Sequence, residues 1–242
     1  STDVVAALTT AQVAALNTAQ IAALTTDQMG ALTSSQIGAL SGTQIAALTT
    51  TNIAAISTDN IATLGTKAIA ALTTAQLNAL TSDQIEALTS AQIGSLAADD
   101  IAVMQADDIA QFTTSEFAAI NPKAIAGLAT AVIATLDTDM VQALTSSQVA
   151  ALSTAQISAL TSDQVAVLGT AQVSALSAAQ IGAFSSDNIA ALTTTQVPAL
   201  SLKALSALSS AQADAMTSDQ FGALTTTQIA ALSSSAISAL ST

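Results

Sequence analysis

Hydrophobic and polar positions recur every eight residues along the whole chain. From Ser1 the sequence divides into thirty octads without insertion or deletion, and only Ser241 and Thr242 are left over. Position 8 of every octad is a large apolar residue, and position 5 is Ile, Val, Leu, Met or Phe in every octad except the one that carries Ala213. Residues three apart share one face of a helix. We therefore predict that positions 5 and 8 form the core.

The spacing favours short helices over the other structures that an eight-residue period permits. In one continuous helix, eight residues overshoot two turns by about 80°, so the apolar stripe would wind around the helix and face no single partner. A solenoid of strands requires alternation with period two, and the abundant Ala and Gln are poor strand formers. Each octad is therefore predicted to form one short helix.

The residues at the start of each octad support this interpretation. Position 1 is Ser, Thr, Asn, Asp or Gly except in the octads that begin at Ala97, Gln105 and Ala129, and this is the N-cap preference. Position 4 is most often Gln, which completes a capping box, although a ladder of glutamines is a second interpretation. Pro122 stands at the first helical position, where proline is tolerated. Pro198 stands at position 6, where it predicts a tightened or bent octad. Each octad thus reads as about seven helical residues and a corner.

Helices of this length are marginal alone, so they must be stabilised by stacking. We expect an all-α solenoid of about thirty very short helices, one per octapeptide, which forms a single continuous domain over residues 1–242. The spacing of Asp at position 3 fits roughly 3.4 octads per superhelical turn. With coils 8–10 Å apart, such a solenoid is a rod of roughly 80 Å. A backbone with four or more octads per turn would contradict this prediction.

The charged residues of position 3 define two candidate assembly stripes. This position holds ten of the sixteen acidic residues, where a carboxylate complements the helix dipole. On the 3.4-octad period, nine of them share one longitudinal stripe: Asp3, Asp27, Asp59, Asp83, Asp107, Asp139, Asp163, Asp187 and Asp219. Lys67, Lys123 and Lys203 share a second phase, and each is followed by Ala in place of the usual Gln. These stripes either pair neighbouring rods laterally or reflect one local packing that recurs.

Composition and charge exclude many functions. The chain has no His, Cys, Trp, Tyr or Arg, so it lacks the usual zinc ligands, a thiol nucleophile and an imidazole base. We expect no enzyme activity and no cofactor. A net charge of −13 without a basic cluster argues against nucleic acid and anionic membranes as partners, and fits cations better. The apolar runs are too short to span a bilayer, so membrane insertion is not expected.

Acidic residues cluster in successive octads in the middle of the chain, at Asp99, Asp100, Asp107, Asp108 and Glu116. Clustered carboxylates can hold calcium, which makes these residues weak metal candidates. The alternative is that they satisfy helix dipoles, since no Asp-x-Asp-x-Asp-Gly loop is present. Octads 13 to 18 are also the least regular, which indicates a docking patch, a bend or sequence drift.

The repeat unit resembles a known type of sequence. The segment Leu8-Thr9-Thr10-Ala11-Gln12-Val13-Ala14-Ala15-Leu16, written L-T-x-x-Q-I-x-A-L, is similar to the octapeptide repeats of very long predicted secreted or surface proteins of proteobacteria, some of them adhesin-like. The resemblance covers the whole chain. It implies an extracellular or cell-surface spacer, fibre or adhesive stalk, and it supplies no catalytic residues.

Two functions follow as hypotheses. The first is a structural rod or fibre outside a bacterial cell. The alternative is a binding solenoid or adhesin that uses a side surface, with calcium as a possible link, although the absence of Tyr, Trp and Arg disfavours it. The first and last octads lack the polar character of solenoid caps. Either the chain is a segment of a longer array, or it self-associates end to end or laterally.

Overall fold

Every octad forms one helical element. The computed structural model describes residues 1–239, and these residues contain 28 α-helices, two 3₁₀ helices and no strand. The all-helical solenoid predicted from the sequence is therefore confirmed. The predicted helix length of about seven residues is wrong, because the α-helices have four to six residues.

The chain divides into two compact units, Ser1–Gly127 and Leu128–Thr242. The first unit contains α1 (Thr2–Ala6), α2 (Thr10–Ala14), α3 (Thr18–Ala22), α4 (Thr26–Gly30), α5 (Ser34–Gly38), α6 (Gly42–Ala47), α7 (Thr50–Ala54), α8 (Thr58–Thr63), α9 (Thr66–Ile69), α10 (Thr74–Leu77), α11 (Ser82–Glu86), α12 (Ser90–Ile93), α13 (Ala98–Ala102), α14 (Ala106–Ile109), α15 (Thr114–Ala119) and η1 (Ile125–Gly127). The second unit contains α16 (Thr130–Thr135), α17 (Thr138–Ala143), α18 (Ser146–Ala151), α19 (Thr154–Ser158), α20 (Ser162–Ala166), α21 (Thr170–Ser174), α22 (Ala178–Gly182), α23 (Ser186–Ala191), η2 (Val197–Ala199), α24 (Leu202–Ser206), α25 (Ser210–Asp214), α26 (Ser218–Ala223), α27 (Thr226–Ala231) and α28 (Ser234–Ala239). The single continuous solenoid over residues 1–242 stays a prediction.

The helices are short because each one tightens before its end. The N–H of position 8 donates to the carbonyl three residues back, as from Leu48 to Ile45 at 3.1 Å. Leu48 and Thr49 then adopt extended backbone angles, with φ −66° and ψ 148° followed by φ −71° and ψ 157°. Two extended residues in succession lead the chain out of one helix and into the next. No described residue has a positive φ, so the corner does not require glycine.

Position 1 is the N-cap, as predicted. The side chain of Thr81 accepts a hydrogen bond from the N–H of Gln84 at 3.2 Å, and the side chain of Gln84 accepts one from the N–H of Thr81 at 2.9 Å. This reciprocal pair is the capping box. The octads that begin at Ala97, Gln105 and Ala129 start their helices without a side-chain cap.

The octad that contains Pro198 is tightened, as predicted. Proline at position 6 has no N–H to donate and disfavours an α-helix around it. The octad forms the 3₁₀ helix η2 instead, in which Ala199 donates to the carbonyl of Gln196 at 2.9 Å.

The octad that contains Pro122 departs from the prediction of an α-helix. Asn121 opens a turn there, because its side-chain oxygen accepts the N–H of Lys123 at 2.9 Å, and η1 follows. Gly127 lies so close to the carbonyl of Ala98 that a Cβ atom at this position would overlap it. Position 7 is glycine in this octad alone. A close approach between two backbones thus accompanies the tighter helix.

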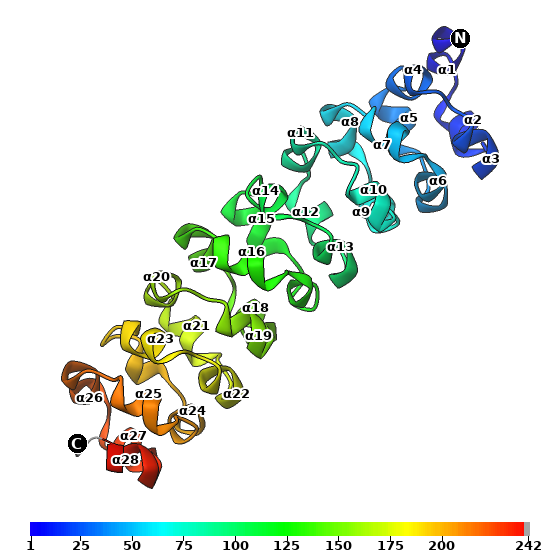
Figure 1. Ribbon diagram of the computed structural model, residues 1–242. Coiled ribbons are helices and arrows are strands. Elements are labelled where there is room, and N and C mark those ends of the chain that lie inside the picture. Colours follow the sequence, from blue (N-terminus) through cyan, green and yellow to red (C-terminus); the bar gives the residue numbers. More distant parts are fainter. Residues whose placement is uncertain (240–242) are drawn as a thin grey trace. The chain divides into compact units, whose positions relative to one another are not determined.

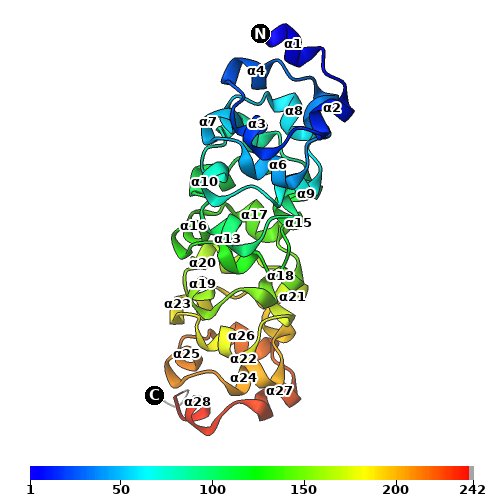
Figure 2. The ribbon, with the colours of Figure 1, turned by 90° about the vertical axis from the view of Figure 1, so that its right-hand side faces the viewer.

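Successive coils stack with between three and four octads per turn inside each unit. Helices three octads apart are in contact: Figure 1 shows α20 beside α23, and Figure 2 shows α3 beside α6. Side-chain amides reach backbone carbonyls of the octad four positions back, at separations of 28 and 31 residues. The two sets of contacts together bracket the 3.4 octads per turn predicted from the Asp spacing.

Positions 5 and 8 form the core, as predicted. Ile53 and Ile56, which occupy these positions in one octad, are 0% and 3% exposed. Among the described residues, the side chains of these two positions are buried in all octads except the first three and the last three. The exceptions are Leu8, Leu16, Leu24, Phe221, Ile229 and Ile237.

Replacement of Gly127 by alanine tests the close approach in the sixteenth octad. We expect Gly127→Ala to destabilise the protein by about 1–3 kcal/mol, because the new methyl group overlaps the carbonyl of Ala98. Urea unfolding followed by circular dichroism measures the change. The control is Gly30→Ala in α4, where the methyl group meets only the carbonyl oxygen of Ala55 at 3.9 Å. This control should stabilise by about 0.5–1 kcal/mol, and equal effects of the two substitutions would contradict the close packing.

Candidate functional site

The amide group at position 4 joins two successive coils. Gln84 is 2% exposed, and its Oε1 accepts the N–H of Thr81 at the start of its own helix. Its Nε2 donates to the carbonyls of Ile53 at 2.9 Å and Ile56 at 2.6 Å, in the octad four positions earlier. One side chain therefore caps the beginning of one helix and the end of another. A buried amide with its oxygen and nitrogen both bonded avoids the cost of an unpaired polar group.

The same arrangement recurs through both units. Each of these glutamines donates from Nε2 to the backbone carbonyl 28 residues earlier. Together they are termed the amide ladder: Gln36, Gln44, Gln76, Gln84, Gln92, Gln156, Gln164, Gln172, Gln180, Gln196, Gln212, Gln220 and Gln228. Among the described residues, no buried side-chain nitrogen or oxygen lacks a hydrogen-bond partner.

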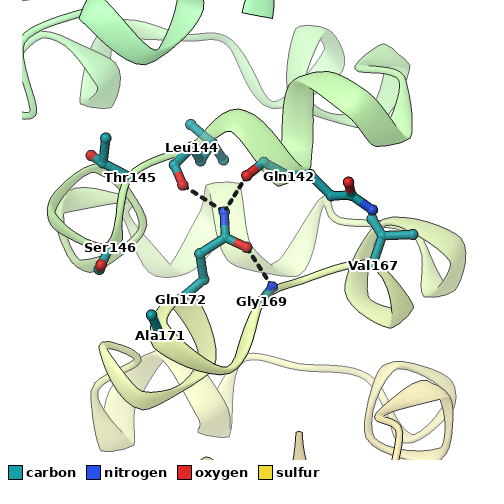
Figure 3. Close-up of a pocket in the computed structure, with 8 residues that line it drawn as sticks. All are labelled: Gln142, Leu144, Thr145, Ser146, Val167, Gly169, Ala171 and Gln172. Carbon is teal, nitrogen blue, oxygen red and sulfur yellow. Dashed lines mark hydrogen bonds between the residues drawn. The ribbon is translucent and has the colours of Figure 1, made fainter.

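The contacts of one ladder glutamine with its own cap and with the earlier coil are termed a rung. Figure 3 shows one rung in the second unit. Nε2 of Gln172 donates to the carbonyls of Leu144 at 2.6 Å and Gln142 at 3.3 Å, while its Oε1 accepts the N–H of Gly169 at 2.6 Å. Gly169 occupies position 1, where most octads have a hydroxyl side chain. A hollow of about 560 Å³ opens here, and it is lined by Gln142, Leu144, Thr145, Ser146, Val167, Gly169, Ala171 and Gln172. Since none of these side chains is charged, the hollow offers no acid or base for catalysis.

Asparagine at position 4 makes a shorter version of the rung. Nδ2 of Asn52 reaches a single carbonyl, that of Leu24, at 2.8 Å. Asn60 likewise donates to Leu32, and its Oδ1 accepts from the hydroxyl of Ser34 at 2.7 Å. One methylene fewer thus limits the side chain to one of the carbonyls at the helix end.

The ladder is interrupted in octads 13 to 18. Position 4 carries there Asp100, Asp108, Glu116, Ala124, Val132 and Met140. The three carboxylates accept the N–H of position 1 in their own octads, at 2.8, 2.9 and 2.8 Å. They therefore keep the capping half of the rung and lose the donor half. The boundary between the two units, after Gly127, falls within this interruption.

The five weak metal candidates cap or begin helices. Asp99 and Asp107 are exposed in the first turns of α13 and α14, and Asp100, Asp108 and Glu116 accept backbone N–H groups. Across residues 1–239, no three acidic side chains lie close enough to form a metal site. These contacts support the dipole and capping interpretation.

The stripe residues of position 3 are exposed in both units. The aspartates lie in the first turns of their helices. The structure places in contact the helices of Asp3 and Asp27, of Asp59 and Asp83, of Asp83 and Asp107, of Asp139 and Asp163, and of Asp163 and Asp187. Lys67, Lys123 and Lys203 are also exposed. Their role in lateral assembly stays a prediction.

Repeated matches to one family cover most of the sequence. The ALTTAQ repeat matches residues 1–34, 53–90, 117–154, 146–178, 165–202 and 199–226, which together span well over half of the chain. The chain belongs to the ALTTAQ repeat family. The hexapeptide itself occurs at residues 7–12 and 71–76, and its last residue is the position 4 glutamine. Among curated proteins, none matches the chain.

The sequence carries a signal for the bridging role of the ALTTAQ glutamine. A capping box accepts Glu as readily as Gln, because only the side-chain oxygen takes part. Position 4 is nevertheless Glu in one octad alone, at Glu116. The preference for the amide indicates that a donor is also required. The capping interpretation of this position is thus correct, and the amide additionally bonds to backbone carbonyls of an earlier coil, not to other glutamines as a ladder of glutamines would require.

The ALTTAQ repeats of the first unit also form a hollow that contains charged side chains. This second hollow, of about 400 Å³, is lined by Thr58, Asp83, Glu86 and Ala87. It contains two carboxylates and a hydroxyl, and among the described residues no hydrogen bond joins the hydroxyl of Thr58 to either carboxylate. No helix within residues 1–239 combines the length and apolar character needed to cross a bilayer.

A change of Gln84 to Glu tests the donor half of the rung. Glu keeps the cap, as Glu116 does, but sets a carboxylate against the carbonyls of Ile53 and Ile56. We expect Gln84→Glu to cost about 1–3 kcal/mol at pH 7 relative to Gln12→Glu. Gln12 is the matched control because it forms the same cap and donates to no carbonyl of the earlier coil.

The loss of stability in Gln84→Glu should depend on pH. Burial beside two carbonyls raises the pKa of the new carboxyl group in the folded state above its unfolded value of about 4.3. The folded state then binds more protons, so the penalty disappears as the pH falls below that value and grows as the pH rises. Urea unfolding of both variants at pH 4 and pH 7 measures the difference. Equal stability of the two variants at pH 7 would contradict the bridging role.

Proposed function

We propose that the protein is a structural element, a stiff extracellular spacer or stalk without catalytic activity. The observation that carries this proposal is the amide ladder. The same buried contact between coils recurs through each unit, so the rise from one coil to the next is held by hydrogen bonds as well as by apolar packing. Because this rise repeats from coil to coil, the number of octads sets the length of the solenoid.

The direction of these bonds suits a spacer. Each rung joins an octad to the preceding coil, so extension of the solenoid would break several rungs in parallel around one turn. Each hydrogen bond of a rung contributes about 0.5–1.5 kcal/mol to stability. Resistance to extension is therefore distributed over three to four octads at each level and is not concentrated in one contact.

The use of polar side chains supports a role without catalysis. The hydroxyls of position 1 accept backbone N–H groups at helix starts, as Thr81 does for Gln84. The glutamines are buried in the ladder, and the carboxylates of position 3 lie exposed in first turns. Among the residues that line the two hollows, no hydrogen bond joins a hydroxyl to a carboxylate that could activate it as a nucleophile.

An extracellular position outside a bacterial cell is part of the proposal. It is supported by the resemblance of the octapeptide to repeats of secreted and surface proteins, some of them adhesin-like. The net charge of −13 also suits an exposed rod, because it keeps neighbouring copies apart and soluble. The tip of such a stalk would carry whatever the protein displays.

Small-angle X-ray scattering tests the spacer. About nine coils of 8–10 Å predict a rod of roughly 80 Å. We expect a distance distribution with a short cross-section and a tail that ends near that length. A compact particle of similar dimensions in all directions would contradict the spacer.

Antibody labelling tests the extracellular position. Intact cells that produce the protein should bind an antibody against the purified chain as strongly as permeabilised cells do. Labelling that appears only after permeabilisation would place the protein inside the cell and would contradict this part of the proposal.

A further inference from the structure

The hollow of Figure 3 has a counterpart in the first unit that is built from the same positions of the octad. This third hollow, of about 260 Å³, is lined by Leu96, Ala97, Ala98, Asn121, Lys123 and Ala124. Each of these residues stands six octads before a residue that lines the hollow of Figure 3, in the order Leu144, Thr145, Ser146, Gly169, Ala171 and Gln172. The two hollows are therefore equivalent places in the repeat, and they are compared residue by residue.

The two places differ in the side chain at position 4. Gln172 holds its amide between two segments of backbone, where Oε1 accepts the N–H of Gly169 at 2.6 Å and Nε2 donates to the carbonyl of Leu144 at 2.6 Å. The counterpart of Gln172 is Ala124, which is 2% exposed and ends at its Cβ atom. Position 4 of this octad thus brings no amide into the hollow.

The backbone groups that hold the amide of Gln172 have counterparts beside Ala124. The N–H of Asn121 corresponds to that of Gly169, and the carbonyl of Leu96 corresponds to that of Leu144. Both residues lie outside the helices, and within residues 1–239 no hydrogen bond joins this N–H or this carbonyl to another group. Because Asn121 and Leu96 both line the hollow, it offers one donor and one acceptor to a molecule that enters it.

A donor and an acceptor in this arrangement select a primary carboxamide. Such a group accepts with its oxygen and donates with its nitrogen, as the amide of Gln172 does. A carboxylate has no donor, and an ammonium group has no acceptor. Glu116 shows the first case, because its carboxylate accepts the N–H of Thr113 at 2.8 Å and has no proton to donate to a carbonyl. The methyl groups of Ala97, Ala98 and Ala124 add an apolar lining that suits a short hydrocarbon stem.

We propose that the hollow at Ala124 binds the primary carboxamide of a glutamine side chain that belongs to another polypeptide. The oxygen of this amide accepts the N–H of Asn121, and its nitrogen donates to the carbonyl of Leu96. A glutamine carries the amide on two methylenes, as every rung of the ladder does. Ala97, Asn121 and Lys123 are exposed, so the hollow is open to a side chain that arrives from outside. This site goes beyond the spacer role, since it gives the solenoid a specific point of attachment.

Nuclear magnetic resonance of the isotope-labelled chain tests the chemistry of the site at the backbone N–H of Asn121. Propionamide carries the glutamine amide on a shorter stem, and butanone has the same shape with a methyl group in place of the NH₂ group. We expect propionamide to shift the Asn121 signal with saturation. Butanone should bind at least about tenfold more weakly, because it has no hydrogen to donate to the carbonyl of Leu96.

A pair of short peptides tests the source of the carboxamide. One peptide contains a single glutamine and is blocked at both ends without any other primary amide, and its partner contains glutamate at the same place. The glutamine peptide should saturate the signal that propionamide shifts, whereas the glutamate peptide at pH 7 should leave it unchanged.

Two variants exchange the properties of the equivalent hollows. Ala124→Gln supplies the amide from the chain itself, so the response of Asn121 to propionamide should be lost. Gln172→Ala frees the N–H of Gly169 and the carbonyl of Leu144, so the Gly169 signal should gain the response. The matched control is Ala126→Gln, which adds the same side chain at an exposed position of the same octad and should preserve binding. Circular dichroism verifies that each variant retains the helical content of the unmodified chain.

Four results would overturn the proposal. They are an Asn121 signal that propionamide does not saturate, equal binding of butanone, a response that survives Ala124→Gln, and a Gly169 signal that gains nothing in Gln172→Ala. Saturation by propionamide without any response to the glutamine peptide would overturn the assignment of the partner as a polypeptide.

Discussion

The amide at position 4 is the interaction on which the rest of the structure depends. An α-helix leaves four N–H groups at its start and four carbonyls at its end without partners inside the helix. In helices of four to six residues, these unpaired groups make up nearly the whole backbone. Gln84 satisfies one N–H of its own helix and two carbonyls of another with a single buried group. Very short helices become tolerable because each one completes the end of a neighbour.

Two sets of contacts with different spacing determine how the coils stack. Helices pack against helices three octads along the chain, whereas the amides bond to carbonyls four octads back. A turn of three whole octads or of four whole octads would satisfy only one of these two sets of contacts. Both sets are satisfied when a turn contains between three and four octads. The first turn of each helix then lies beside the last turn of another, where a donor meets acceptors. The apolar core of positions 5 and 8 adds the non-directional part of the stabilisation.

The sequence contains the local structure almost completely and the contacts between coils only in part. The octad register, the cap at position 1 and the buried pair represented by Ile53 and Ile56 follow from spacing and residue type. The donor role of Gln84 was harder to predict, because its carbonyl partners lie 28 and 31 residues away and any residue type supplies a carbonyl. The 3₁₀ helix beside Gly127 depends on a close approach to Ala98, which no periodicity reveals. Helix length was overestimated, since the early tightening from Leu48 to Ile45 is a property of the corner geometry.

The uniformity of the rungs has a consequence for how such a chain varies in evolution. A glutamine of the ladder recognises the backbone of the octad four positions back and makes no demand on its side chains. Gain or loss of a whole octad therefore leaves each remaining rung with an equivalent partner. A change by any other number of residues shifts positions 4, 5 and 8 out of phase for every coil that bridges it. Genes for such arrays are thus free to lengthen or shorten in steps of eight codons, and length becomes a trait that selection can adjust without a new fold.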